Sequence, residues 1–173
     1  MLAGSCVDLP AVFDAVGGGA ELSEARSVID GGPNAWGTLG GLLERGKLVW
    51  RFRPDCDDLW FGLIHGAEPV PLDWRAGREH PRGYEILSDS NGWVYALGKT
   101  LWGKPPNWRT ASRGSVVECS LDMDVRTMSF AVDDNPECLV FKDIKAPVRP
   151  MIWGGNAKLL LVRGPAGALV SGF

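Results

Sequence analysis

The chain has 173 residues, a length that suits one domain with a sizeable core. Hydrophobic residues make up 45% of it, and this share argues against global disorder. The net charge of −3 does not indicate general binding to nucleic acid. No apolar run approaches the roughly 20 residues that a membrane-spanning helix needs.

The amino-terminal residues 1–20 allow two interpretations. Asp8, Leu9 and Pro10 favour the start of a short helix that would run through Val16 and end at the glycines that follow. The alternative is a loose arm that packs on the rest of the domain. The start of the chain holds acids but no Lys or Arg, so it fits neither a signal peptide nor a transit peptide. We therefore expect a cytoplasmic location, or a nuclear one.

Two apolar patterns follow an expected first strand within residues 21–29. Leu48, Trp50 and Phe52 alternate with more polar positions, which predicts a strand with one buried face. Residues 59–64 are apolar throughout, which is typical of a strand covered on both faces. The acidic residues 55–58 between them are interpreted as the solvated tip of a hairpin, because the ligand spacing of a calcium loop is missing.

The middle of the chain alternates long loops with short strands. Three prolines and three glycines in residues 66–83 exclude regular structure there, and loops on rigid β scaffolds commonly carry function. Residues 83–87 and 91–95 are predicted as two strands joined by a polar turn. Residues 99–113 are predicted as another loop.

The carboxyl half gives the clearest strand signal. Val117, Cys119 and Leu121 share one face of a predicted strand, and Met128 and Phe130 share one face of the next. A tight polar connection joins the two, so the sequence predicts an antiparallel hairpin with one wet face. Three further strands are expected at these ranges: 139–141, 151–153 and 159–162.

Four segments of this half occur in an order and at a spacing that resemble a SPRY domain. The segments are residues 121–124, 127–130, 139–142 and 150–156. The resemblance implies an all-β fold, a bent antiparallel β-sandwich with little helix, used as a protein-binding scaffold. We expect the sandwich to cover residues 21–163, between an arm or short helix at 1–20 and a tail at 164–173.

The same resemblance implies a partner-binding site. Tyr84, Leu87 and Trp93 match positions at or beside the ligand pocket of SPRY domains, and Trp153 with Gly154 matches a Trp-Gly pair of the peptide-binding subset. For Trp153 a place in the core is the alternative. An Arg that the subset supplies from an early loop has no counterpart in residues 34–37, which argues against the subset's short Asp- and Asn-bearing peptide as the ligand.

Charge is separated along the chain. Residues 75–113 hold seven basic and three acidic residues, whereas residues 1–44 hold one basic and six acidic residues. If the basic loops share one end of the sandwich, Arg75, Arg78 and Arg109 would steer an acidic partner or peptide segment toward it. A scattered solvated surface is the alternative.

Residue chemistry argues against an enzyme. The two histidines have no nucleophile or acid at a suggestive spacing, and no Gly-rich phosphate loop is present. The four cysteines (Cys6, Cys56, Cys119 and Cys138) lack metal-ligand spacing, so no metal and no cofactor are expected. We predict a protein-interaction module that is a subunit or adaptor of a larger assembly. A lectin-like carbohydrate-binding protein and an RNA-associated subunit are the alternatives.

Overall fold

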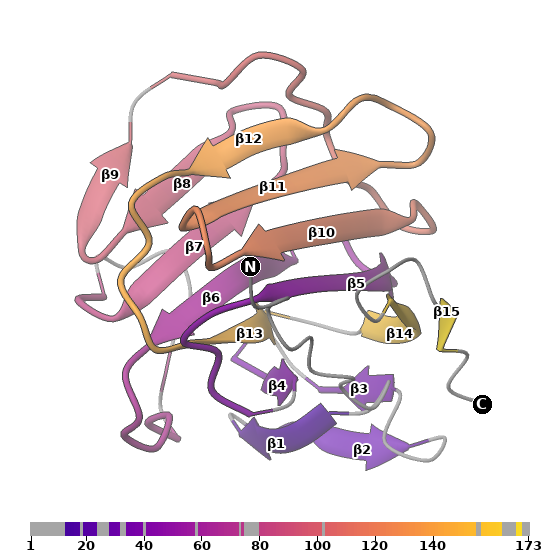
Figure 1. Cartoon of the computed structure of the whole chain (residues 1–173). Helices are drawn as coiled ribbons and strands as arrows, with labels where there is room; N and C mark the ends of the chain where they lie inside the picture. Colours follow the sequence, from indigo (N-terminus) through magenta and orange to yellow (C-terminus); the bar gives the residue numbers. More distant parts are fainter. Residues whose placement is uncertain are drawn as a thin grey trace.

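The computed structural model is built from antiparallel β-strands (Figure 1). It describes residues 13–17, 19–23, 28–31, 34–39, 41–57, 59–72, 74, 80–101, 103–154, 157–163 and 169–170. Within these ranges there is no helix, and hence none that could cross a bilayer. The predicted all-β fold is confirmed.

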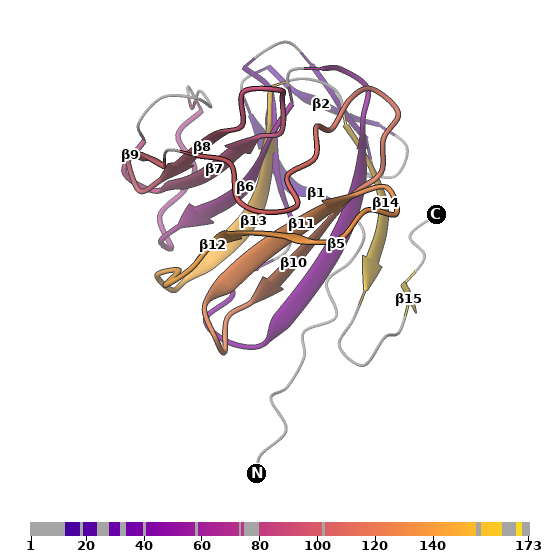
Figure 2. The ribbon, with the colours of Figure 1, turned by 90° about the horizontal axis from the view of Figure 1, so that it is seen from above.

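The strands form two sheets that lie as separate layers (Figure 2). The first sheet has seven strands, in the order β1 (Phe13–Gly17), β4 (Trp36–Leu39), β13 (Val148–Trp153), β6 (Trp60–His65), β7 (Gly83–Leu87), β8 (Trp93–Ala96) and β9 (Lys99–Leu101). The second has the order β12 (Cys138–Phe141), β11 (Thr127–Val132), β10 (Val117–Asp122), β5 (Lys47–Pro54), β14 (Ala157–Arg163), β3 (Val28–Asp30) and β2 (Glu21–Ser23), with β15 (Leu169–Val170) paired to β14.

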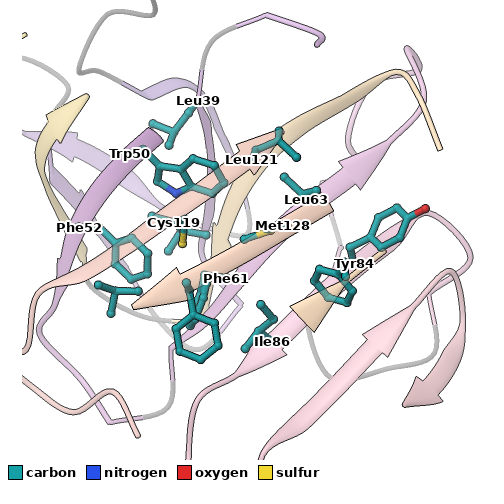
Figure 3. Packing of buried hydrophobic residues seen from close by; sticks show 14 of the residues in the cluster. Leu39, Trp50, Phe52, Phe61, Leu63, Tyr84, Ile86, Cys119, Leu121 and Met128 are labelled. Carbon is teal, nitrogen blue, oxygen red and sulfur yellow. The ribbon is translucent and has the colours of Figure 1, made fainter. Parts of the chain in front are cut away.

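The core lies between the two sheets, where the alternating strands place their apolar faces (Figure 3). In the second sheet Trp50 lies opposite Cys119, and Cys119 lies opposite Phe130. The Phe61 ring of the first sheet lies 5.3 Å from those of Phe52 and Phe130. The five residues predicted to be buried are at most 1% exposed, which confirms that prediction: Trp50, Phe61, Leu121, Phe130 and Phe141.

Residues 61–64 of β6 are buried on both faces of the sheet, as the continuous apolar sequence predicts. Its inward residues Phe61 and Leu63 belong to the main core. Its outward residue Ile64 belongs to a second cluster, in which Val70 and Trp74 of the following loop cover the outer face of the first sheet. The predicted absence of regular structure in residues 66–83 holds for the described part of that loop, up to Gly83, where β7 begins.

Three sequence predictions are wrong in detail. Residues 13–17 form an edge strand of the first sheet rather than the end of a helix, because the buried Phe13 anchors them to β4. The hairpin predicted with its tip at residues 55–58 does not form, because β5 and β6 lie in different sheets. Residues 99–101, assigned to a loop, form the edge strand β9.

Phe130 provides a test of the core. Its side chain is fully buried, with the rings of Phe61 and Trp108 packed edge-on against it at 5.3 and 5.4 Å. We expect Phe130→Ala to lower the free energy of unfolding by about 3–5 kcal/mol, measured by urea denaturation. Val125→Ala, at a turn position that is 64% exposed, is the control and should change it by less than about 0.5 kcal/mol. Equal losses in the two variants would contradict the packing described here.

The hairpin between β10 and β11 makes stability depend on pH. Burial alone would raise the pKa of Asp122, but Lys47 at 2.7 Å and the turn amides of Val125 and Asp124 outweigh it and hold the pKa below its ordinary value. The ionised form therefore stabilises the fold above about pH 4, and this contribution is lost as the pH falls through the lowered pKa.

Asp122→Asn keeps the acceptor for the turn amides and removes the charge. We expect it to cost about 0.5 kcal/mol of unfolding free energy at pH 7, a value typical of an ion pair with one exposed partner. In urea denaturation series the difference from the parent should shrink toward zero at about pH 2. Asp134→Asn, at an exposed turn position, is the control. A difference that stays constant down to low pH would rule out the ion-pair explanation.

Candidate functional site

One cross-strand row at the end of the first sheet carries three of the predicted site residues. Trp153 lies opposite Trp60, Trp60 lies opposite Leu87, and Leu87 lies opposite Trp93. Directly opposed residues of antiparallel strands point to the same face. The register therefore brings Leu87, Trp93 and Trp153 together on the outer face, although 66 residues of sequence separate Leu87 from Trp153.

Exposure increases along this row from one edge of the sheet to the other. Trp153 is 2% exposed, because the Trp74 ring from the covering loop stacks on it with a centroid distance of 6.0 Å. Trp60 and Leu87 are half-buried, and Trp93 is 37% exposed. The alternative that Trp153 is a packed residue is the one the structure supports, and the accessible part of the row lies on β6, β7 and β8.

Tyr95 extends the accessible part. Its ring lies 5.7 Å from that of Trp60 and 6.4 Å from that of Trp93, and the Trp93 and Tyr95 rings are parallel within 7°. We call Trp60, Leu87, Trp93 and Tyr95 the aromatic strip. Half-exposed aromatic side chains held against one another on a sheet offer a large contact area that loses little conformational freedom on binding.

The turn before Trp93 is firmly held. The Asp89 carboxylate accepts hydrogen bonds from the backbone N–H groups of Asn91 at 2.9 Å and Gly92 at 2.7 Å. The indole N–H of Trp108 donates to the Asp89 carbonyl at 3.2 Å. Gly92 has a φ of 70°, a conformation that favours glycine. These contacts fix the direction in which the chain enters β8, and so they fix the position of Trp93.

A long loop, residues 103–116, joins the two sheets at this end of the molecule. The Ala111 N–H donates to the Ser88 carbonyl at 2.8 Å, and the Gly114 N–H donates to the Pro54 carbonyl at 3.0 Å. Arg109 belongs to this loop and is exposed. Its guanidinium donates to the Asn135 side chain at 3.2 Å, so it lies toward the second sheet rather than beside Trp93.

Tyr84 does not lie with the other predicted site residues. It is 3% exposed and faces the core, with its ring packed edge-on against Phe141 at 5.3 Å (Figure 3). Its hydroxyl accepts a hydrogen bond from the Lys145 N–H at 2.9 Å, and burial raises its pKa. Tyr84 and Leu87 are three positions apart on a strand, and an odd separation puts them on opposite faces. The expected surface patch therefore forms without Tyr84.

Gly154 and the remaining basic residues complete the predicted set. Gly154 follows Trp153 with a φ of 82°, and its N–H donates to the Ala35 carbonyl at 2.8 Å. Its carbonyl accepts a weak hydrogen bond from the Cys56 thiol at 3.8 Å, which ties it to the connection between the sheets. Arg75 and Arg78 lie outside the described residues.

Sequence reasoning missed Trp60 and Tyr95. On sequence alone, Trp60 is assigned only to a buried strand, and Tyr95 only to a strand next to Trp93. Their period provided a signal: Trp60 and Ile64 fall on one face of β6, and Trp93 and Tyr95 on one face of β8. What the period could not show is which of these faces stays uncovered.

Neither a protein-family model nor a curated protein matches this sequence. Solved structures do match. The chain is similar to the SPRY domain of human HERC1, with a TM-score of 0.60 and 21% identity, over 81% of this chain and 92% of that one. It is also similar to the TRIM65 PSpry domain, with a TM-score of 0.66 and 13% identity, over 87% of this chain and 89% of that one.

These likenesses identify the class of fold and then the fold within that class. The class is the two-sheet antiparallel β-sandwich already described. Within that class the chain has a SPRY-like fold, which confirms the resemblance found in the sequence. SPRY domains are in general protein-interaction modules.

Tyr84→Phe separates a structural role of the Tyr84 hydroxyl from a role in binding. We expect the substitution to lower the free energy of unfolding by about 0.5–1.5 kcal/mol in urea denaturation, because it removes the acceptor of the Lys145 N–H. Binding to any partner isolated with the parent chain should not change, because the side chain faces the core. Unchanged stability combined with weaker binding would return Tyr84 to the binding surface.

Proposed function

We propose that this protein is a non-enzymatic protein-interaction module that binds its partner through the aromatic strip at the loop end of the sandwich. The observation that carries the proposal is a set of aromatic side chains that remain accessible on the outer face of the first sheet, in the same row as the covered Trp153. Aromatic residues at the centre of an interface usually supply most of its binding energy. The firm turn before Trp93 supports a surface that is already ordered before the partner arrives.

The proposal extends to the setting in which the module works. We propose that it acts as a subunit or adaptor of a larger assembly, in the cytoplasm or the nucleus. Imaging of the tagged chain in its own cells checks the location. A lectin-like function is the second candidate from the sequence, and sugar binding through a stacked aromatic ring would also involve Trp93. Elution from the partner by free sugar would favour that candidate.

Affinity purification of the intact chain, followed by mass spectrometry, identifies the partner. Its affinity is then measured for the parent chain and for Trp93→Ala. We expect the variant to bind more weakly by about 2 kcal/mol or more, which is about 30-fold, because it removes a central aromatic contact.

The matched control is Leu139→Ala on β12 of the other sheet. Leu139 is 42% exposed, close to the 37% of Trp93, so both variants remove a partly exposed apolar side chain. The control should bind as the parent does, and the unfolding curves of both variants should stay close to that of the parent. If Trp93→Ala keeps full affinity with its fold intact, the aromatic strip is not the binding surface.

A further inference from the structure

The aromatic strip is small compared with a protein–protein interface. Three of its side chains, Trp60, Leu87 and Tyr95, are half-buried, and Trp93 is 37% exposed. A standard interface uses roughly 20–30 residues on each side, and the interface of an obligate dimer is larger still. The size of the strip therefore suits a short peptide segment of a partner better than a globular surface or a second copy of this chain.

The spacing of the strip across the sheet favours one backbone conformation for such a segment. Trp60 of β6 and Trp93 of β8 lie in one cross-strand row, with Leu87 of β7 between them. Neighbouring strands lie about 4.8 Å apart, so the backbones at the two tryptophans are about 9.6 Å apart. A polyproline II helix has three residues per turn and rises about 3.1 Å per residue, so one face of it repeats about every 9.3 Å. A segment in this conformation that lies along the row can place residues i and i+3 over the two tryptophans.

Other regular conformations fit the row less well. On one face of an extended strand the side chains repeat about every 6.8 Å, which falls short of the second tryptophan. Two turns of an α-helix rise about 10.8 Å, and an isolated helix that short is unstable in water. Polyproline II needs no internal hydrogen bonds, and proline-rich segments already adopt it before they bind. A short segment therefore loses least conformational freedom if it binds in this form.

The chemistry of the strip also suits proline. Surfaces lined with aromatic rings are the usual docking sites of proline-rich segments. Tyr95 makes the aromatic surface continuous, because its ring lies 5.7 Å from that of Trp60 and 6.4 Å from that of Trp93. A tryptophan offers a ring face to a proline and an N–H donor to the solvated carbonyl groups of a polyproline II segment. The strip includes no Lys, Arg, Asp or Glu, so its charge matches that of an uncharged segment.

We propose that the aromatic strip binds a proline-rich segment of the partner in the polyproline II conformation. Prolines at positions i and i+3 of this segment pack on Trp60 and Trp93, and the residues between them pass over Leu87. The inference rests on the proposed function, because it concerns the same surface, and it adds the class of ligand that this surface recognises.

The test uses the intact chain labelled with nitrogen-15 and capped hexapeptides. The probe is acetyl-Ala-Pro-Ser-Ser-Pro-Ala-amide, and we expect it to shift the backbone amide signals of Leu87 and Trp93 and the indole signal of Trp60 in a saturable way. The isomer acetyl-Ala-Pro-Ser-Pro-Ser-Ala-amide keeps the composition but places the prolines two positions apart. A proline-free peptide replaces both prolines by Ser. Both comparison peptides should bind more weakly by about fivefold or more, because each loses at least one ring contact.

One variant connects the spacing to the two tryptophans. Trp60→Leu keeps an apolar side chain at the start of β6 but removes the ring. It should weaken binding of the probe by about fivefold or more, and the probe should then bind no better than its isomer, because only one tryptophan of the row remains. A loss of packing alone would weaken both peptides equally and keep their ratio. Leu139→Ala, on the other sheet, is the control and should keep the affinity and the ratio of the parent.

Several outcomes would overturn the proposal, and the peptide comparison on the parent chain needs no variant. Equal binding of the probe and its isomer, or no signal shift at millimolar probe, would remove the spacing argument. Tighter binding of peptides in which Arg or Glu replaces both prolines would mean that charge is recognised. An unchanged preference for the probe in Trp60→Leu, with its fold intact in urea denaturation, would remove Trp60 from the site.

The failure of this inference can be told apart from the failure of the proposed function. If the peptides bind equally but Trp93→Ala still weakens binding of the co-purified partner, only the proline-rich ligand is wrong. If Trp93→Ala keeps full affinity for that partner, the proposed function itself is wrong, whatever the peptides do.

Discussion

Strand β6 can lie against β7 only because position 62 is a glycine. A Cβ atom at Gly62 would lie 1.9 Å from the carbonyl oxygen of Tyr84, and the residue has a φ of 150°. This close approach fixes the register of the two strands, and the register fixes which side chains meet. With Gly62 opposite Glu85, Trp60 must lie opposite Leu87. The aromatic strip is a consequence of that single pairing.

The same register explains why one strand of the sheet serves two purposes. Tyr84 and Ile86 of β7 face the core, while Leu87 faces outward in the row of Trp60 and Trp93. A slip by one residue would exchange these faces and place the Tyr84 hydroxyl in solvent. The hydrogen bond from the Lys145 N–H to that hydroxyl therefore opposes the slip, even though it lies far from the accessible surface.

Local pattern predicted the strands well and their surroundings poorly. Alternation identified β5, β10 and β11 and their buried faces. The two-residue period of a strand can be recognised from the order of polar and apolar residues within the strand itself. The depth of Trp153 depends on Trp74, which lies 79 positions earlier in the chain and covers it through a loop. The connection between β5 and β6 is predicted as a hairpin because turn residues mark a change of direction and do not specify which sheet the next strand joins. Both features depend on contacts between distant segments.

The loop of residues 103–116 holds the surroundings of the aromatic strip in place. The indole N–H of Trp108 donates a hydrogen bond to the turn that leads into Trp93. Backbone hydrogen bonds to Ser88 and Pro54 attach this loop to both sheets. A partner that meets elements already held in place has less side-chain and loop freedom to remove on binding. The long irregular loop therefore has a structural role at this end of the molecule, because it holds the turn that leads into Trp93 and is attached to both sheets.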